Sequence, residues 1–398
     1  MSVPGRPWWA RPGLEARGGR LWFAGRDAEA LAREHGTPVY VLDPARVEAK
    51  VAGLQAALAG AGLRHQVLFA LKSNRHPAVL GRLRGLGSVG IDACSPDELA
   101  LALESGWRAE EISYTGTNLS ERDLDRVLPR PVVLNLDSLS ALRRVGARAP
   151  GRHIGLRLNP GVGAGYSAQL TYAGDKPTKF GIYLERLDAA LEEAARHGLV
   201  VEGLHMHVGS GWLGQGMRAF LEALGRVAEA ARRLPGLRYV NVGGGIGVPL
   251  HASDQAVDLH AYAAGSAERL GPLGVTVMCE PGDFLVKDAG LLLVEVVSVE
   301  EKGGVLFVGV DCGFNAFCLP VLYDFHQEVV LCRAADAPPF RDVTVAGHIN
   351  EAGDLFAEDC PLPEVREGDV LAFLNAGGYG AAMASYHCAR PPAGEIAL

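Results

Sequence analysis

Short apolar runs recur along the first two thirds of the chain, and longer segments rich in Ala, Leu, Glu and Arg separate them. Runs of about four to eight residues are typical of buried strands, whereas 184–197 and 217–234 have the apolar spacing of amphipathic helices. Strands that alternate with helices indicate βα units in a parallel sheet, so the pattern predicts a (β/α)8 barrel, with a doubly wound sheet as the alternative. The expected strands are 67–72, 89–93, 112–116, 132–137, 154–159, 201–208, 239–245 and 275–280.

The pattern changes after residue 290, where strand-like runs are separated by Gly, Pro and Asp and no long amphipathic helix is evident. These runs predict an all-β C-terminal domain, with strands at 291–297, 305–310, 328–332, 343–346 and 370–374. The N-terminal segment has a short strand at 21–24, a helix at 28–35 and a strand at 39–42. The resulting α/β protein is divided into an N-terminal segment (1–43) that joins the β domain, a barrel (44–288) and a β domain (289–398).

Composition and charge exclude several classes of protein. Apolar residues make up 48% and charged residues 21% of the chain, as in a globular protein, and the net charge of −8 argues against nucleic-acid or anionic-membrane partners. The longest apolar stretch, 289–299, is interrupted by Glu295 and is too short to span a bilayer. The first residues contain charges and prolines where a signal peptide needs an apolar core, and seven scattered cysteines without a CxxC pair favour a reducing compartment. We therefore expect a cytoplasmic protein with neither disulfides nor a structural zinc.

Polar residues and glycines stand where most of the expected strands end. Catalytic groups of such barrels lie at the C-terminal ends of the strands. A lysine there is costly to bury unless it is neutralised or bonded, although a lysine that extends to the rim is the simpler alternative. The residues at these ends are Lys72, Asp92, Gly116, Asp137, Asn159, His207 with Ser210, Gly243–Gly245 and Glu280.

Two of these strand ends allow more than one interpretation. Gly243–Gly245 follows a strand and precedes a helical segment, which suits a phosphate-binding loop; a plain glycine turn is the alternative, and the GxGxxG dinucleotide motif is not met. His205 and His207 face the same side of their strand and could bind one metal ion, or one ring could be buried and the other functional. No third ligand follows at a useful spacing, so we predict no metal.

In this order, the strand-end residues and their neighbours resemble the fold-type III pyridoxal-phosphate decarboxylases, most closely the diaminopimelate and ornithine decarboxylase family. The resemblance extends from about residue 38 to the C-terminus and implies a barrel followed by a β domain. The motifs that carry it are FALKSN at 69–74, DACSPDEL at 92–99, RLNP at 157–160, TKFGI at 178–182, GLHMHVGS at 203–210, NVGGGIG at 241–247, EPG at 280–282, PVLYD at 320–324, NEAGD at 350–354 and AGGYG at 376–380.

The resemblance implies roles for these residues. Lys72 would hold pyridoxal 5'-phosphate as a Schiff base, His207 would stack on its ring, and Glu280 would hydrogen-bond the ring nitrogen. An acid keeps that nitrogen protonated, so the ring accepts electrons as CO2 leaves; the related alanine racemases have an Arg there, and Glu280 therefore favours decarboxylation. The other implied cofactor-binding residues are Asp92, Arg157, Ser210, Gly243, Gly244, Gly245, Gly282 and Tyr379.

Two departures from the family pattern concern the substrate. Asp283 replaces the Arg of the family's EPGR motif, and Leu319 replaces the Arg before PxLY. In the family these arginines help to bind the distal carboxylate of the substrate, a strong bidentate contact that an Asp would turn into repulsion. Unless the alignment slips at both places, we expect an amino acid other than diaminopimelate.

A third departure concerns the proton donor. Asn350 stands where the family has a Cys that reaches into the partner subunit's site and is linked to protonation of the α-carbon. An amide is no acid near neutral pH, so water, Lys72 or His348 must supply the proton. The resemblance also implies a head-to-tail homodimer with shared sites, in which residues near 350–354 complete the partner's pocket.

The substrate pocket can be interpreted in two ways. Glu351 matches a family acid that contacts a distal amine, and Asp324 matches an acid of ornithine enzymes; with Asp283 and Tyr323 they would suit a distal ammonium or hydroxyls. Alternatively, the substrate is an acylated amino acid, such as a citryl-diamino acid of siderophore biosynthesis, whose acids meet His348, His326 or Lys287. A diaminopimelate decarboxylase with an unusual pocket, an ornithine- or lysine-type decarboxylase, a non-catalytic cofactor-binding paralogue and a metal-dependent barrel hydrolase remain alternatives.

Overall fold

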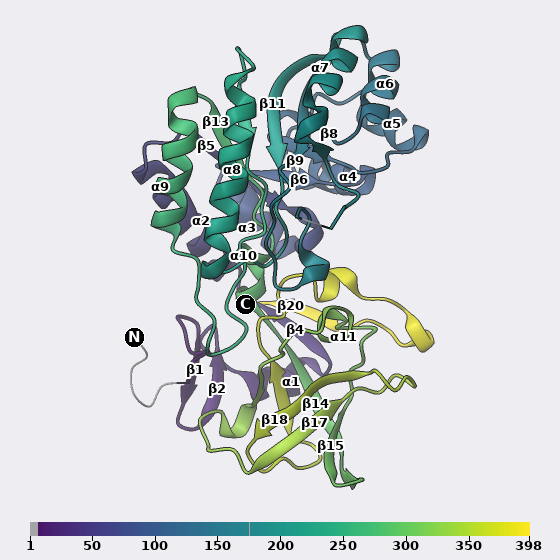
Figure 1. The fold of residues 1–398 in the computed structure, drawn as a ribbon. Coiled ribbons are helices and arrows are strands. Elements are labelled where there is room, and N and C mark those ends of the chain that lie inside the picture. Colours follow the sequence, from purple (N-terminus) through teal and green to yellow (C-terminus); the bar gives the residue numbers. More distant parts are fainter. Residues whose placement is uncertain (1–6, 175) are drawn as a thin grey trace. The chain divides into compact units, whose positions relative to one another are not determined.

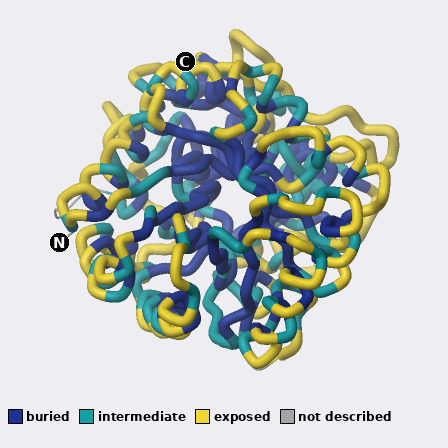
Figure 2. The backbone as a smooth tube through the Cα atoms, turned by 90° about the horizontal axis from the view of Figure 1, so that it is seen from above, coloured by how far each residue is buried: buried dark blue, intermediate teal, exposed yellow. Residues whose placement is uncertain are grey.

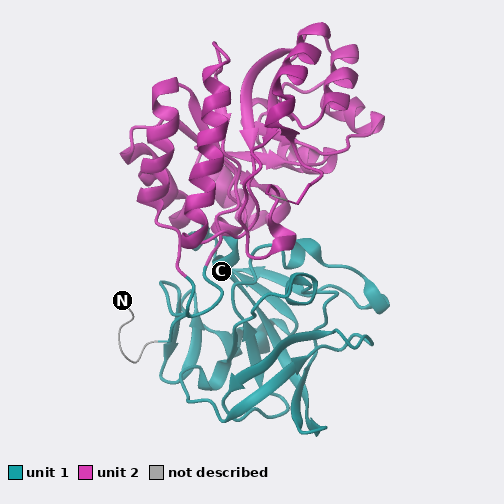
Figure 3. Cartoon of the chain, in the orientation of Figure 1, with its two compact units in different colours: residues 1–47, 249–254, 286–398 teal, residues 48–248, 255–285 magenta. Residues whose placement is uncertain are grey.

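A computed structural model describes residues 7–174 and 176–398, which form two compact units (Figure 3). The barrel unit comprises residues 48–248 and 255–285; the β unit comprises the described residues up to Val47, together with 249–254 and 286–398. The first six residues, part of the predicted N-terminal segment, lie outside the described residues. The sequence-based domain boundaries, 1–43, 44–288 and 289–398, remain a prediction, because compact units in a structure do not show which segments fold independently.

The barrel unit contains eight parallel strands that close into a ring, and Figure 1 labels several of them. Their order is β9-β11-β12-β13-β5-β6-β7-β8, and β8 pairs with β9 to complete the closure. The two-residue β10 (Ile182–Tyr183) pairs with the last two residues of β9. The predicted (β/α)8 barrel is confirmed, and the doubly wound alternative is wrong because an open sheet would leave two edges unpaired. The strands are β5 (His65–Ala70), β6 (Val89–Ala93), β7 (Ile112–Thr115), β8 (Val133–Leu136), β9 (His153–Asn159), β11 (Val200–Met206), β12 (Tyr239–Asn241) and β13 (Thr276–Cys279).

Helices follow most barrel strands, and local capping fixes where several of them begin. Ser95, Ser120 and Ser138 each accept a hydrogen bond from a backbone N–H in the first turn of the next helix. Buried positions are concentrated on the strands, and exposed positions on the outer faces of the helices (Figure 2). The helices are α2 (Pro44–Gly60), α3 (Pro77–Gly85), α4 (Pro96–Glu104), α5 (Glu121–Val127), α6 (Leu139–Arg148), α7 (Leu187–Arg196), α8 (Met217–Arg232), α9 (Leu259–Leu270) and α10 (Asp283–Val286).

The β unit is built around the long strand β14. This strand pairs with β4, β15 and β19, and successive side chains enter opposite cores: Leu292 and Val294 one, Leu291 and Leu293 the other. The all-β prediction for the C-terminal part is therefore confirmed. Its elements are β1 (Leu14–Arg17), β2 (Arg20–Phe23), β3 (Arg26–Asp27), α1 (Ala28–His35), β4 (Val39–Leu42), β14 (Gly290–Lys302), β15 (Val305–Val310), α11 (Leu319–Tyr323), β16 (Val329–Leu331), β17 (Arg341–Ala346), β18 (Leu355–Leu362), β19 (Val370–Phe373) and β20 (Gly394–Ala397).

Four strands of this unit are missing from the sequence-based prediction, namely the short β1 and β3 together with β18 and β20. β18 alternates buried and exposed positions and includes Glu358 and Asp359, so no continuous apolar run marks it. β20 is only four residues long, contains Gly394 and Glu395 and has no buried residue, so only its pairing with β4 defines it as a strand. Among the described helices, none is both long and apolar enough to cross a membrane.

Candidate active site

The amine of Lys72 lies at the mouth of the barrel. The residue sits in a short 3-10 turn directly after β5, and its Nζ is 3.4 Å from Oδ2 of Asp92, the penultimate residue of β6. The Asp92 side chain is almost fully buried, whereas 37% of the Lys72 side chain is exposed. The lysine is thus held by an acid at one end and remains accessible to a ligand.

Asp92 is a buried acid with a perturbed pKa. Burial and the negative charge of Glu280 raise the pKa of Asp92, and the neighbouring Lys72 partly opposes this rise. The carboxyl group can therefore take up and return a proton near neutral pH, next to the Lys72 amine.

Glu280 follows β13 and is buried, with its carboxylate surrounded by donors. His205 Nε2 lies 2.8 Å from Oε2, and the Asn241 amide donates to Oε1 over 2.6 Å. Burial raises the pKa of Glu280, but the adjacent, hydrogen-bonded His205 and the charge of Lys72 outweigh this effect and lower the pKa. Glu280 is an ionised acid at neutral pH.

The two histidines of the His-x-His pair make different contacts. His205 contacts the Glu280 carboxylate through Nε2. The His207 ring instead lies edge-on to the Tyr172 ring, with 5.2 Å between the ring centroids. Burial, Lys72 and Arg157 lower the pKa of His207 well below its usual value, so the ring is neutral. In the part of the chain that the structure describes, no three His, Cys, Asp or Glu side chains are grouped to hold a metal ion.

The glycines after β12 allow very close backbone packing. A Cβ on Gly244 would lie 2.0 Å from the Glu280 carbonyl oxygen, and one on Gly245 1.9 Å from that of Gly209. Gly243 and Gly245 also have positive φ values of 70° and 92°. No side chain fits at 244 or 245, so this loop presents backbone only, which suits a phosphate group.

Arg157 contributes a buried positive charge from β9. Its guanidinium lies 4.8 Å from the centroid of the Phe180 ring. Burial lowers the pKa of Arg157, and Asp137, Glu280 and Asp92 oppose this effect. The barrel mouth therefore combines one buried cation with several acids.

Asp283 is fixed in place at the start of α10. It is buried, and its Oδ2 accepts a hydrogen bond of 3.0 Å from the Tyr166 hydroxyl, which itself accepts one of 2.7 Å from the Val248 N–H. The Tyr166 ring occupies the space that a side chain at Gly211 would need, and its hydroxyl lies where a side chain at Gly247 would begin. The residue that departs from the EPGR motif is thus part of the ordered wall of the barrel mouth.

Of the remaining predicted residues, Ser210 and Gly282 lie in the barrel unit and the others in the β unit. Leu319 is buried in α11 and Tyr323 ends that helix, while Asp324 has a left-handed φ of 55° and lines a cavity of about 670 Å³ within this unit. Asn350 and Glu351 are exposed in the turn between β17 and β18. Four further predicted residues are also in this unit: His326, His348, Lys287 and Tyr379.

Asp354 fixes the turn that carries Asn350 and Glu351. Its carboxylate accepts hydrogen bonds of 2.7 Å from the backbone N–H groups of Phe314 and Ile349. Burial raises the pKa of Asp354. The two exposed side chains are therefore presented by a turn with defined backbone contacts.

Comparison with known proteins identifies the family. Residues 44–287 match the family model described as "Pyridoxal-dependent decarboxylase, pyridoxal binding domain". The diaminopimelate decarboxylase of Methanothermobacter thermautotrophicus is 36% identical over 391 residues, which cover 95% of this chain and 90% of the relative. The chain belongs to the pyridoxal-dependent decarboxylases.

Solved structures support the same assignment for this decarboxylase. Diaminopimelate decarboxylase from Helicobacter pylori, complexed with L-lysine, superposes with a TM-score of 0.84 at 30% identity, covering 93% of each chain. The SrLDC mutant in complex with PLP superposes with a TM-score of 0.80 at 25% identity, covering 93% of this chain and 94% of that one. The protein is an amino-acid decarboxylase that uses pyridoxal phosphate.

The residues of the barrel mouth suit this cofactor. The Gly243–Gly245 backbone admits a phosphate, and the Nδ1 atom of His207 is buried without a hydrogen-bond partner among the described residues, as expected of a ring that contacts a ligand by its face. Glu280 is ionised and Lys72 is accessible. The barrel unit thus brings together a reactive amine, a flat ring, an acid and a phosphate loop.

Asn241, Ser113 and Tyr166 are not expected at this site from the sequence, which left open whether His205 binds a metal ion or is buried. His205 and Asn241 hold Glu280, and Tyr166 holds Asp283. His205 is two residues before His207 on the same strand, and Asn241 is two residues before Gly243. Because alternate residues of a strand face the same side, this spacing could have placed both side chains at the site. Tyr166 lies in an irregular loop, where no periodicity could reveal it.

Proposed function

We propose that this decarboxylase acts on meso-diaminopimelate. The proposal is supported by the diaminopimelate decarboxylases to which the chain is similar over more than nine tenths of its length. The observation that carries the decarboxylation chemistry is the ionised, buried Glu280, which is held by three hydrogen-bond partners beside an accessible Lys72. This is the arrangement that a reaction with a protonated cofactor ring requires.

The chain's own residues have distinct tasks in the proposed mechanism. Lys72 would hold the cofactor through its Nζ, and the neighbouring Asp92 accepts and returns a proton at that atom. When bound, pyridoxal phosphate supplies the ring that accepts the electron pair released as CO2 leaves.

Glu280, His207 and the glycine loop hold the reacting groups in position. Glu280 keeps a proton at the ring nitrogen, and the neutral His207 presents a flat face that excludes water. Gly243–Gly245 and Ser210 bind the phosphate, with backbone N–H groups as donors. Asp92, Arg157, Gly282 and Tyr379 complete the proposed cofactor contacts.

A second candidate is favoured by one specific observation. Asp283 is buried and fixed by Tyr166 where the family has an arginine, and Leu319 replaces the other arginine. This carboxylate suits a substrate that lacks a distal carboxylate at that place. Free diamino acids such as ornithine or lysine, and acylated conjugates such as a citryl-diamino acid of siderophore biosynthesis, fulfil that condition.

A substrate panel tests both candidates. The holoenzyme is incubated with meso-diaminopimelate, ornithine, lysine, arginine and citryl-diamino acids, and CO2 release is measured under kcat/KM conditions. The proposal expects kcat/KM for meso-diaminopimelate to exceed that of the others by about tenfold or more. Preference for a substrate without a distal carboxylate would establish the second candidate, and no CO2 from any of them would indicate a non-catalytic paralogue.

We also propose a head-to-tail homodimer in which Asn350 and Glu351 of one protomer complete the site of its partner. Support comes from the family resemblance of the 350–354 segment and from the exposure of both side chains in a well-anchored turn. Asn350 cannot act as the acid of the family Cys, so water, Lys72 or His348 returns the proton to the α-carbon.

A further inference from the structure

A chain of polar side chains crosses the core of the barrel beneath Glu280. The Tyr239 hydroxyl donates to Asn135 Oδ1, the Asn135 amide donates to Ser113 Oγ, and Ser113 donates to Glu280 Oε1, each over 3.0 Å. Asn135 and Ser113 are fully buried, and 3% of Tyr239 is exposed. Burying polar groups costs folding free energy unless they form hydrogen bonds with one another, so a polar network inside a barrel core indicates a function.

The direction of each hydrogen bond in this network is determined. Asn135 Nδ2 lies 3.0 Å from the hydroxyls of both Ser113 and Thr115, and its Oδ1 faces the Tyr239 hydroxyl. Burial raises the pKa of Tyr239, so its hydroxyl stays protonated and donates. Because Ser113 already accepts from the amide, its own hydrogen is directed to Glu280. Every donor in the chain therefore points toward the carboxylate.

Two glycines in the barrel strands provide the space for this network. Asn135 of β8, Gly155 of β9, Gly203 of β11 and Tyr239 of β12 are register neighbours in one layer. A Cβ on Gly155 would lie 2.2 Å from Asn135 Oδ1, and one on Gly203 would lie 2.1 Å from Tyr239 Cζ. Glycine weakens a strand interior, so two glycines here indicate that the Tyr239–Asn135 pair takes the space of two core side chains.

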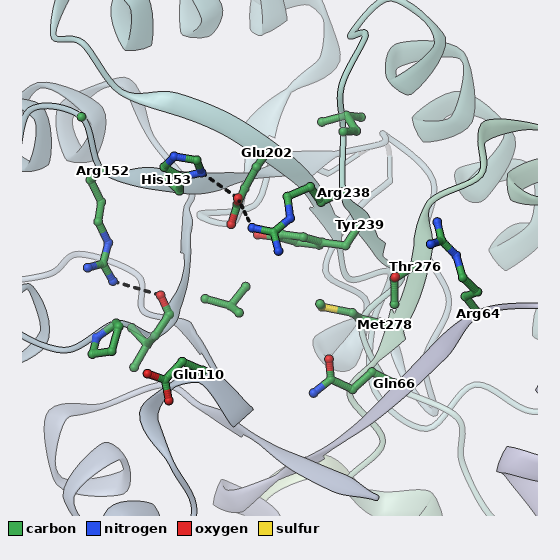
Figure 4. Close-up of a pocket in the computed structure, with 15 residues that line it drawn as sticks. Arg64, Gln66, Glu110, Arg152, His153, Glu202, Arg238, Tyr239, Thr276 and Met278 are labelled. Atoms are coloured by element: carbon green, nitrogen blue, oxygen red, sulfur yellow. Dashed lines mark hydrogen bonds and ion pairs between the residues drawn. The ribbon is translucent and has the colours of Figure 1, made fainter.

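The network ends at the opposite mouth of the barrel. Tyr239 is one of the residues around a cavity of about 850 Å³ at the N-terminal ends of the strands, beside Gln66, Thr276 and Met278 (Figure 4). Lys72 and Glu280 stand at the C-terminal ends of β5 and β13. The chain thus connects Glu280 to the layer of the core that is farthest from the proposed chemistry.

We propose that Tyr239, Asn135 and Ser113 are positioning residues that orient one donor onto Glu280 and so keep the proton on the cofactor's ring nitrogen rather than on the carboxylate. The inference rests on the proposed role of Glu280. Together with Asn241 and His205, Ser113 gives this carboxylate three donors. Removing one donor increases the proton affinity of the carboxylate, and the ring nitrogen then loses its share of the proton.

The test uses holoenzyme loaded with pyridoxal phosphate that carries 15N in its ring. Ser113→Ala should move the ring-nitrogen resonance toward the unprotonated position, for which Glu280→Gln gives the reference. With the substrate that the panel identifies, kcat should fall about tenfold and KM should change little, because a hydrogen bond to a charged group is worth roughly a factor of ten. Tyr239→Phe, which keeps the ring and removes only the hydroxyl, should cause a smaller change in the same direction.

Thr115→Val is the matched control. It removes a hydroxyl that is bonded to the same Asn135 amide but does not face Glu280, so the resonance should stay at the wild-type position. A merely structural role would lower the thermal unfolding temperature of Tyr239→Phe without moving the resonance. If Ser113→Ala and Tyr239→Phe keep the wild-type resonance and kcat while Glu280→Gln changes both, the positioning role is overturned. If Glu280→Gln also leaves the resonance and kcat unchanged, the proposed role of Glu280 itself is contradicted.

Discussion

At the residue scale, the barrel mouth is a set of charged groups whose protonation states are set by their neighbours. Glu280 stays ionised because its interactions with His205 and Lys72 outweigh the cost of burial, whereas burial and the charge of Glu280 raise the pKa of Asp92. The two carboxyl groups therefore have pKa values shifted in opposite directions. This division of roles allows one to hold a proton on a ligand and the other to exchange one.

Asp92 should make the stability of the apoprotein depend on pH in one direction. Its pKa is raised from 3.8 to about 7 in the fold, so its stabilising contribution is complete below the unfolded value and is lost as pH rises toward 7. Compared with wild type, Asp92→Asn should therefore gain relative stability from pH 4 to pH 8. Thermal unfolding of both apoproteins over this range measures the difference, and a difference that stays constant with pH would contradict the assignment.

Asp283 should control substrate choice without affecting cofactor binding. Asp283→Arg restores the family charge, so kcat/KM for meso-diaminopimelate should rise relative to ornithine and lysine by about tenfold or more, since an Arg–carboxylate pair replaces a repulsion. Cofactor affinity, followed by absorbance, should be unchanged. Tyr166→Phe, which keeps Asp283 but removes its hydroxyl partner, is the matched comparison. Unaltered selectivity of Asp283→Arg would show that this position does not contact the distal end.

At the element scale, the site depends on where strands end and how closely the following loops approach one another. The segments after β11, β12 and β13 touch through backbone atoms at Gly209, Gly245 and Glu280. Apolar runs in the sequence predict the strands, and their terminal residues include Asp92, His207 and Glu280. The contacts between consecutive loops, and the Tyr239–Asn135 pair inside the barrel, depend on register between strands far apart in the sequence, which periodicity does not encode.

Gly245→Ala should abolish tight cofactor binding. The new methyl would lie 1.9 Å from the Gly209 carbonyl oxygen and force the phosphate loop apart. Gly236→Ala is the control, because Gly236 has a similar φ of 91° but no atom within 4 Å of the added methyl. Equilibrium dialysis should show at least about a tenfold rise in the Kd for pyridoxal phosphate for Gly245→Ala only, with a stability cost of about 1 kcal/mol for both from the positive φ. Equal cofactor affinity in the two variants would contradict the close-packed loop.

At the scale of the whole molecule, a barrel unit carries the proposed cofactor site and a β unit carries several of the residues predicted to meet the substrate. The sequence predicts both architectures because strand and helix periods differ and the change after residue 290 is sharp. It does not predict β18 and β20, because Glu358 and Asp359 interrupt the apolar residues of β18 and β20 is only four residues long; pairing with a neighbouring strand defines both. The β unit also includes β4 from the N-terminal segment, a pairing between distant parts of the chain.

The proposed homodimer can be tested by mixing two defective variants. Lys72→Ala lacks the covalent attachment site, and Glu351→Ala lacks the residue expected to act in the partner's site. If sites are shared, about half of the randomly formed dimers are hybrids with one intact site each, so the mixture should recover about a quarter of wild-type activity. Each variant alone should release almost no CO2. A mixture that stays at the level of the parents, although subunit exchange is demonstrated, would contradict shared sites.

The covalent attachment of the cofactor at Lys72 is the claim on which the account depends most. The holoenzyme is reduced with borohydride, digested and mapped by mass spectrometry, in parallel with Lys72→Ala. The account predicts the mass of reduced pyridoxal phosphate on Lys72, no other modified lysine, and no modified peptide in the variant. Modification of a different lysine, or none in the cofactor-loaded wild type, would contradict it.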